Sequence, residues 1–145
     1  MSASDPRLDG FRITTKREEI DQEAVYRYLS ETSYWAQGRA REVVAASMEG
    51  SLCFGVIDRA GATVGFARVV TDRATFGWVC DLFIVDACQG RGLGTWLVES
   101  IVSDPVLERV KRLMLATRDA HELYRRHGGF SSVEPSQRWM ERVLP

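Results

Sequence analysis

The sequence predicts an α+β domain, an α/β sandwich in which helices flank a mixed, mostly antiparallel sheet. Three observations indicate this fold class. Stretches with helical spacing of apolar residues alternate with strand-like runs along the chain. Three strand-like runs follow one another between residues 52 and 85, which is typical of an antiparallel meander. A glycine-rich loop then leads from the last of these runs directly into a helix.

A short strand and two helices are expected before the meander. Residues 11–15 alternate between apolar and polar side chains, as a strand does. Residues 18–33 carry apolar side chains at helical spacing, and their first turn is acidic, which favours a helix start. A second helical stretch lies between Gly38 and Gly50, and glycine is a common helix terminator. The loop that joins the two helices is aromatic.

The meander consists of strands predicted over residues 52–57, 63–71 and 76–85, with a turn at residues 58–61. The third strand is almost continuously apolar. Strands of that composition are typically buried on both faces. We therefore expect the third strand in the centre of the sheet.

Two further helices and two strands are expected after the glycine loop. Apolar residues from Leu93 to Ile101 fall at helical spacing, and Pro105 marks the end of that helix. Residues 110–117 are predicted as a strand and residues 119–127 as a short helix closed by two glycines. A last strand is predicted over residues 137–143.

Length and composition favour a single domain over residues 1–145. The formal net charge of −1 lacks the basic surplus of a dedicated nucleic-acid binder, so a nucleic-acid partner is disfavoured. No stretch approaches the ~20 apolar residues that span a bilayer, so we expect no membrane association and a cytoplasmic location. The three cysteines lack metal-ligand spacing, and no metal is expected.

The sharpest chemical signal is the loop Gln89-Gly90-Arg91-Gly92-Leu93-Gly94 at the start of a helix. Unpaired backbone N–H groups and glycines that allow close approach make such a loop a phosphate cradle. The loop matches neither the P-loop pattern nor the dinucleotide fingerprint, since Thr95 stands where the latter has its third glycine. On glycine content alone, a tight turn without a ligand is the favoured interpretation.

The same loop resembles the [RQ]-x-x-G-x-[GA] motif of the GNAT N-acetyltransferase superfamily. Leu82-Phe83-Ile84-Val85 before it resembles that family's fourth strand, and Ala120-His121-Glu122-Leu123-Tyr124 with Gly129-Phe130 resembles its A-x-x-L-Y helix. The resemblance covers roughly residues 11–143. It implies the GNAT fold, with a splayed gap between the fourth and fifth strands, acetyl-CoA as donor and a primary amine as acceptor.

The resemblance also implies the residues that would hold acetyl-CoA. These are Phe83, Ile84, Val85, Gln89, Gly90, Arg91, Gly92, Leu93, Gly94, Thr95, Thr117 and Tyr124. Two departures are visible: Thr117 stands where the family often has Asn, and an extra glycine separates Tyr124 from the Gly-Phe pair.

Two residues are candidate catalytic groups. The resemblance makes Tyr124 the candidate general acid for the departing thiolate, against the alternative of a packing aromatic. Asp81 is the only charged residue between positions 76 and 85, and a carboxylate there is costly unless paired or functional. If Thr71 faces Phe76 across the hairpin, Arg68 lies diagonally from Asp81 on the same face. Asp81 is therefore either a base or ammonium anchor, or a structural ion-pair partner of Arg68.

The acceptor site is expected around Tyr34, Trp35, Arg68 and Trp78, with hydrophobic anchoring as the alternative role of the aromatics. The predicted function is direct acetyl transfer from acetyl-CoA to a primary amine of a small molecule or peptide. A catalytically silent acyl-CoA-binding sensor or subunit with the same fold is the alternative. A homodimer is left open.

Overall fold

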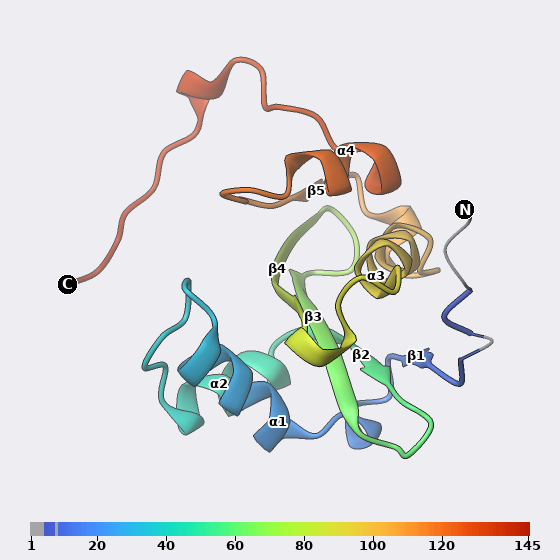
Figure 1. Cartoon of the computed structure of the whole chain (residues 1–145). Coiled ribbons are helices and arrows are strands. Elements are labelled where there is room, and N and C mark those ends of the chain that lie inside the picture. Colours follow the sequence, from blue (N-terminus) through green and yellow to red (C-terminus); the bar gives the residue numbers. More distant parts are fainter. Residues whose placement is uncertain (1–4, 8) are drawn as a thin grey trace.

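The computed structural model describes residues 5–7 and 9–145, and in them a five-stranded sheet in the order β1-β2-β3-β4-β5 (Figure 1). The first three pairings are antiparallel and the pairing of β4 with β5 is parallel. The mixed sheet confirms the α+β prediction. The strands are β1 (Arg12–Thr14), β2 (Leu52–Ile57), β3 (Thr63–Thr71), β4 (Phe76–Ile84) and β5 (Arg112–Met114).

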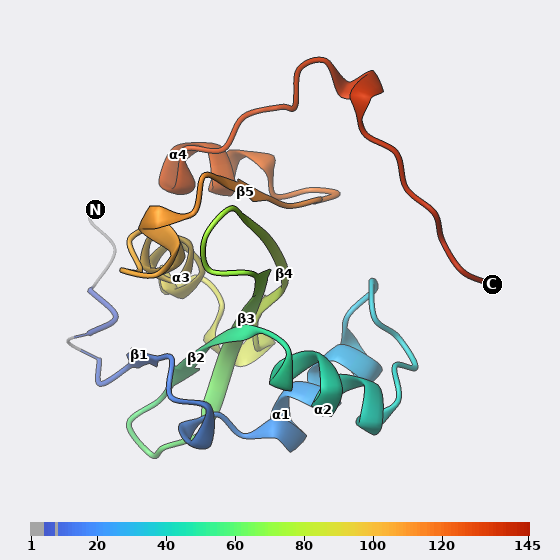
Figure 2. The same ribbon diagram turned by 180° about the vertical axis from the view of Figure 1, so that it is seen from behind.

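Helices cover both faces of the sheet (Figures 1 and 2). One core cluster joins α1 and α2 to one face, and the other joins α3 to the opposite face. α4 packs beside α3. The α-helices are α1 (Gln22–Arg27), α2 (Arg41–Glu49), α3 (Leu93–Val102) and α4 (His121–Gly128), with short turns η1 (Arg17–Glu19), η2 (Tyr28–Thr32), η3 (Asp86–Cys88), η4 (Leu107–Arg109) and η5 (Ser136–Arg138).

The helix predicted over residues 18–33 is interrupted at Ile20 and changes its winding at Tyr28. Ile20 is extended, and the Asp21 carboxylate accepts hydrogen bonds from the amides of Glu23 and Ala24, so it caps a new helix. A side-chain oxygen at that position satisfies amides that the helix leaves unpaired. α1 then widens into the η2 turn, which ends at Ser33.

The apolar run predicted that the third strand of the meander, β4, lies at the centre of the sheet. This prediction is wrong. β3 occupies the centre, and β4 lies between β3 and β5. β4 is also not buried on both faces, because exposed Phe76 and Trp78 alternate with buried Gly77 and Val79. The apolar side chains of β4 therefore do not all enter the core, and Trp78 lines a groove instead.

The register between β3 and β4 differs from the prediction and contains a bulge. Thr71 pairs with Gly77 rather than Phe76, and Arg68 pairs with Cys80. Ala67 alone then stands opposite two residues of β4, one of which is Asp81 with φ +56°. Aspartate is among the few non-glycine residues that adopt such backbone angles. A bulge bends its strand and increases its twist, which redirects the last residues of β4.

The C-terminal part of the chain contradicts two predicted strand bounds. β5 spans only Arg112–Met114 instead of residues 110–117, and the strand predicted over 137–143 does not form. The chain after α4 leads away from the domain, and Met140 in it is 95% exposed (Figure 1). Alternating apolar residues are not sufficient for a strand, because a strand also needs a hydrogen-bonding neighbour.

No helix in the described ranges is both long enough and apolar enough to cross a bilayer.

Candidate functional site

A groove runs between the second half of β4 and the segment that leads from β5 into α4. It consists of two cavities of about 350 and 570 Å³. Both are lined by Tyr34, Trp35, Leu82, Asp119 and Leu123, so they adjoin. The smaller cavity ends at Asp81 and Tyr124, and the larger one ends at the glycine loop. We refer to them as the Asp81 end and the loop end of the groove.

The groove exists because β4 and β5 pair only over a short distance. Residues Phe76–Trp78 pair with Arg112–Met114, and the two strands then part. The bulge at Asp81 follows three residues after the last paired position and turns β4 away. The described chain therefore contains the gap between the fourth and fifth strands that the family resemblance implied.

The loop end is formed by the start of α3. Gly92 is the N-cap of this helix with φ +81°, a conformation that side chains other than glycine rarely adopt. A Cβ atom at Gly90 or Gly94 would meet no atom within 4 Å, and one at Gly92 only Pro6 at 3.9 Å. The amides of the first helical turn have no partner within their own helix. Open space above a row of amide donors fits a phosphate group.

Neighbouring side chains of the loop have other roles. The Gln89 side-chain amide donates to the Ile84 carbonyl at 3.0 Å and to the Asp86 carboxylate at 3.3 Å, which ties the loop to the end of β4. The Arg91 guanidinium lies over the Phe11 ring, 6.0 Å from its centroid. Leu93 is buried in the core between α3 and the sheet. Among these residues, Gln89 and Leu93 line the loop end, together with Thr95.

The wall opposite β4 is the start of α4. The Thr117 hydroxyl accepts a hydrogen bond from the Ala120 amide at 3.0 Å and so fixes the turn that leads into the helix. At the other end, the helix closes on Gly129, whose φ is +72°, and the Phe130 amide donates to the Tyr124 carbonyl. A Cβ atom at Gly128 would lie 2.8 Å from the Phe130 ring. Gly128 therefore allows close packing of the helix end against Phe130. Despite the additional glycine, Tyr124 lines the groove.

Tyr124 meets the Asp81 end of the groove from α4. Its ring makes an edge contact with Phe130, with 5.8 Å between ring centroids. Burial, with smaller contributions from Tyr34 and Cys80, raises the pKa of the Tyr124 hydroxyl to about 12. The phenol is therefore protonated at every physiological pH and can donate a hydrogen bond into the groove.

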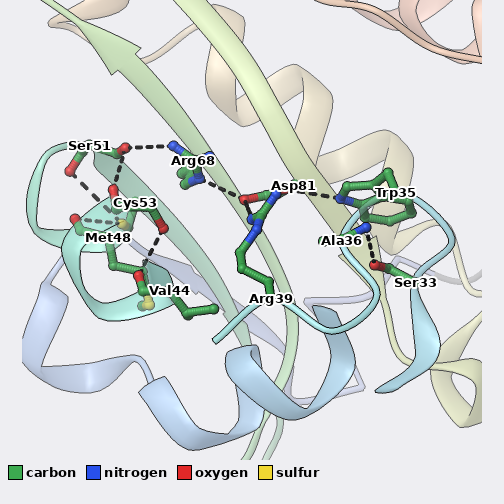
Figure 3. Close-up of polar contacts among 11 residues, drawn as sticks. Ser33, Trp35, Ala36, Arg39, Val44, Met48, Ser51, Cys53, Arg68 and Asp81 are labelled. Carbon is green, nitrogen blue, oxygen red and sulfur yellow. Dashed lines mark hydrogen bonds and ion pairs between the residues drawn. The ribbon is translucent and has the colours of Figure 1, made fainter. Parts of the chain in front are cut away.

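Asp81 is at the centre of a polar network (Figure 3). Its Oδ2 accepts from the Arg68 Nε and from the Arg39 Nη1, both at 2.7 Å, and its Oδ1 accepts from the Trp35 Nε1 at 2.9 Å. The Arg68 Nη1 also donates to the Ser51 hydroxyl at 3.2 Å. The Asp81 side chain is only 2% exposed. The ion pair with Arg68, one of the two alternatives for Asp81, is present, although the register that suggested it was wrong.

Two opposing effects act on the Asp81 carboxyl. Burial raises its pKa, but the hydrogen bond and charge of Arg68 and then those of Arg39 outweigh burial and hold the pKa below its usual value. A carboxylate held in this way is a weak proton acceptor at neutral pH. The geometry therefore favours the role of ion-pair partner over that of a general base.

The four predicted acceptor residues Tyr34, Trp35, Arg68 and Trp78 all line the Asp81 end. Sequence reasoning missed Arg39, which follows the predicted aromatic loop and contacts Asp81 across 42 residues of chain. It also missed Arg118, whose guanidinium lies 3.7 Å from the centroid of the Tyr34 ring. Neither contact has a spacing signature in the sequence.

Cys80, which lines the Asp81 end, and Cys53 in the core are poor nucleophiles. Burial raises the pKa of the Cys80 thiol to about 11, and it also raises the pKa of the buried Cys53 thiol. Within residues 5–7 and 9–145, no group of three His, Cys, Asp or Glu side chains is arranged to hold a metal ion.

Comparison with known proteins gives a consistent family match. The model of the "Acetyltransferase (GNAT) domain" family matches residues 49–128, which include the groove-forming strands, the glycine loop and α4. A "Putative acetyltransferase" of Gibberella zeae is 27% identical over 120 residues, covering 69% of this chain and 67% of that protein.

Solved structures share the whole architecture. A "putative acetyltransferase belonging to the gnat family" from Xanthomonas campestris pv. campestris is 36% identical, with a TM-score of 0.88, and covers 93% of this chain and 94% of its own. An "Acetyltransferase, GNAT family protein" from Streptococcus pneumoniae is 20% identical, with a TM-score of 0.68, covering 93% and 97%. The second likeness concerns the fold alone.

Proposed function

Because this chain belongs to the GNAT acetyltransferase family, we propose that it transfers an acetyl group from acetyl-CoA to a primary amine. The observation that carries the proposal is the groove. It joins the loop end, which offers backbone amides to a phosphate, to the half-buried polar Asp81 end. One end suits the phosphates of coenzyme A and the other suits an acceptor. Acetyl-CoA, when bound, supplies the acetyl group as a thioester.

The cradle would be formed by backbone rather than by charged side chains. Gly90, Gly92 and Gly94 leave open space over the first turn of α3, where amide donors and the helix dipole favour an anion. Thr95 and Gln89 border the same space. Arg91 contributes positive charge from the loop, although its guanidinium lies toward Phe11.

The edge of β4 would hold the extended pantetheine arm. The Val85 amide donates to the Val64 carbonyl of the neighbouring chain segment at 2.9 Å, so Val85 faces β3. Backbone groups of successive strand residues point to opposite sides. Of Phe83, Ile84 and Val85, we therefore propose Ile84 as the residue whose backbone faces the gap, with its amide as donor and its carbonyl shared with Gln89, and with Phe83 and Val85 supporting it. Thr117 borders the gap from the opposite wall.

Two side chains would assist the transfer itself. We propose that Tyr124 donates a hydrogen bond to the leaving sulfur, since its hydroxyl stays protonated. We propose Asp81 as a positioning residue that fixes Arg39, Arg68 and Trp35 around the acceptor. Direct transfer needs no protein nucleophile, and ordered water is the proposed path for the proton that the amine loses.

The cradle yields a first prediction: Gly92→Val should weaken acetyl-CoA binding by about tenfold or more while the fold persists. The new side chain would enter the space that the phosphates need and would strain a backbone with φ +81°. Calorimetric titration with acetyl-CoA measures the change.

Gly61→Val is the matched control for strain. Gly61 lies in the turn between β2 and β3 with φ +89°, and its Cβ position is equally open. This variant should lose a similar amount of stability and keep its affinity for acetyl-CoA. Equal affinities of wild type, Gly92→Val and Gly61→Val would contradict the cradle.

The transfer function is tested by incubating the protein with acetyl-CoA and a panel of small amines, amino acids and peptides. Release of free thiol that depends on the amine is the expected result, with mass spectrometry identifying the acetylated product. Tight binding of acetyl-CoA without amine-dependent thiol release would favour the silent binding protein instead. A cytoplasmic location and a homodimer stay predictions, which fractionation and light scattering test.

A further inference from the structure

The residues that line the groove carry one more positive than negative charge, because Arg39, Arg68 and Arg118 accompany only Asp81 and Asp119. Arg39 and Arg68 both donate to one oxygen of Asp81, so two guanidinium groups share one carboxylate. Asp119, the other acid that lines the groove, has its own cationic neighbour, Arg118, at 3.8 Å. Pairing each acid with one arginine leaves one positive charge at the Asp81 end without an anion of its own. Unbalanced charge in a half-buried site favours an anionic ligand.

Arg39 is the residue with unused donors. Arg68 is occupied on two sides, by Asp81 at Nε and by Ser51 at Nη1. For Arg39, Asp81 is the one partner among the residues that the structure describes, and it engages Nη1 only. The Nε and Nη2 groups of a guanidinium lie on one edge and match the two oxygens of a carboxylate. The Arg39 side chain is 23% exposed and lines the groove, and the hydrogen bond to Asp81 leaves its Nε and Nη2 donors for a ligand.

The charge surplus does not serve the phosphates of coenzyme A. The proposed phosphate cradle is at the loop end, beyond Leu82 and Phe83, which also line that cavity. The thioester and the pantetheine arm, which would lie nearer Asp81, are uncharged. An anion at the Asp81 end therefore has to come from the acceptor.

We propose that the acceptor is an amine that carries a carboxylate, and that Arg39 binds this carboxylate through its Nε and Nη2 groups. One surplus charge matches a monoanion better than a phosphate dianion. Trp35 and Trp78 border the same cavity and form an apolar wall for the remainder of the acceptor. The inference rests on the proposed acetyl transfer and names the substrate class for it.

Equilibrium binding tests the carboxylate site without requiring turnover. Trp35 and Trp78 line the cavity, so their fluorescence reports binding of β-alanine, β-alaninamide and 2-aminoethyl phosphate, each titrated with acetyl-CoA absent and with a coenzyme A analogue present. The comparison of carboxylate with amide is then repeated for the common amino acids and their amides. Carboxylates are expected to bind about tenfold or more tightly than their matched amides, the usual effect of a charge-assisted hydrogen bond.

Three variants test whether Arg39 causes the preference for carboxylates over amides. Arg39→Gln should abolish the preference for carboxylates, and Arg39→Lys should retain part of it because the charge stays but the two-donor edge is lost. Both should fold, since Asp81 keeps Arg68 as its partner. Arg41→Gln is the matched control, because exposed Arg41 pairs with Glu23 on the outer surface and should leave the preference unchanged.

Each outcome decides the proposal separately from the transfer function. Amides that bind as well as carboxylates, or a preference that survives Arg39→Gln, would overturn the carboxylate site even if acetyl transfer is observed. Tighter binding of 2-aminoethyl phosphate would also overturn it, in favour of a phosphate-bearing acceptor. A carboxylate preference that depends on Arg39 supports the site, and thiol release with the same amines then tests the transfer function by itself.

Discussion

Tyr124→Phe is expected to lower kcat by ~10²–10³-fold, with little change in the affinity for acetyl-CoA. The substitution removes one hydroxyl and keeps the ring that packs against Phe130. Because the pKa of this hydroxyl is about 12, above the ~8.5 of an ordinary thiol, complete proton transfer to the leaving sulfur runs uphill. We therefore expect Tyr124 to stabilise the leaving sulfur by donating a hydrogen bond. This bond becomes stronger in the transition state, where negative charge develops on the sulfur, than it is with the thioester.

The pH dependence distinguishes this role from an ionising acid. A tyrosine with a pKa of about 12 stays protonated below that value, so kcat should not decline between about pH 8 and 10 because of Tyr124. Tyr26→Phe is the matched control, since Tyr26 lies on α1 and contacts Arg41 outside the groove. The variant Tyr124→Phe is measured under conditions where chemistry limits the rate. If its kcat equals that of the wild type, Tyr124 is a packing residue only.

Asp81→Asn is expected to destabilise the protein by about 3 kcal/mol, the lower part of the range for broken buried ion pairs. It leaves Arg39 and Arg68 without an anion, and the partial exposure of both arginines moderates the cost. Asparagine tolerates the positive φ of this position, so the backbone of the bulge is preserved. Thermal unfolding should show a decrease in Tm of roughly 10 °C.

The sign of the pH effect follows from the lowered pKa of Asp81. Its ion pairs stabilise the protein fully above the pKa of the unfolded carboxyl, ~3.9, and that stabilisation is lost as the pH falls through the lower folded value. The stability difference between wild type and Asp81→Asn should therefore be constant near neutral pH and shrink below about pH 4.

Glu23→Gln is the matched control, because it removes an exposed ion pair with Arg41 and should change Tm little. Asp81→Asn should also lose activity, because the arginines and Trp35 lose their common partner. An unchanged Tm with abolished turnover would contradict the ion-pair role and return Asp81 to the role of base or ammonium anchor.

Local signals in the sequence predicted most elements of the fold. The meander, α2, α3 and α4 follow from apolar spacing and from glycine at helix ends, which are properties of neighbouring residues. The strand expected over 137–143 failed because its pattern says nothing about a pairing partner. β4 was misplaced at the sheet centre because an apolar run cannot distinguish a core-facing side chain from a groove-lining one such as Trp78.

The residues that line the candidate site were predictable where a motif or a costly buried charge marked them. The glycine loop, Tyr124 and the pairing of Asp81 with Arg68 belong to this group. The bulge was not predictable, because Asp81 adopts a left-handed conformation that only the three-dimensional context enforces. Arg39 was missed because a loop brings it to Asp81 from a distant part of the chain.

Transfer of the acetyl group to an amine can be followed on the transferred carbon atoms themselves. The protein is incubated with acetyl-CoA labelled with ¹³C in the acetyl group and a mixture of amines and peptides with and without a free carboxylate, and the label is followed by NMR. We expect the label to leave the thioester and to appear in an amide, in an amount equal to the coenzyme A released. Label that remains in the thioester while acetyl-CoA is bound, or that appears only as free acetate, would contradict it.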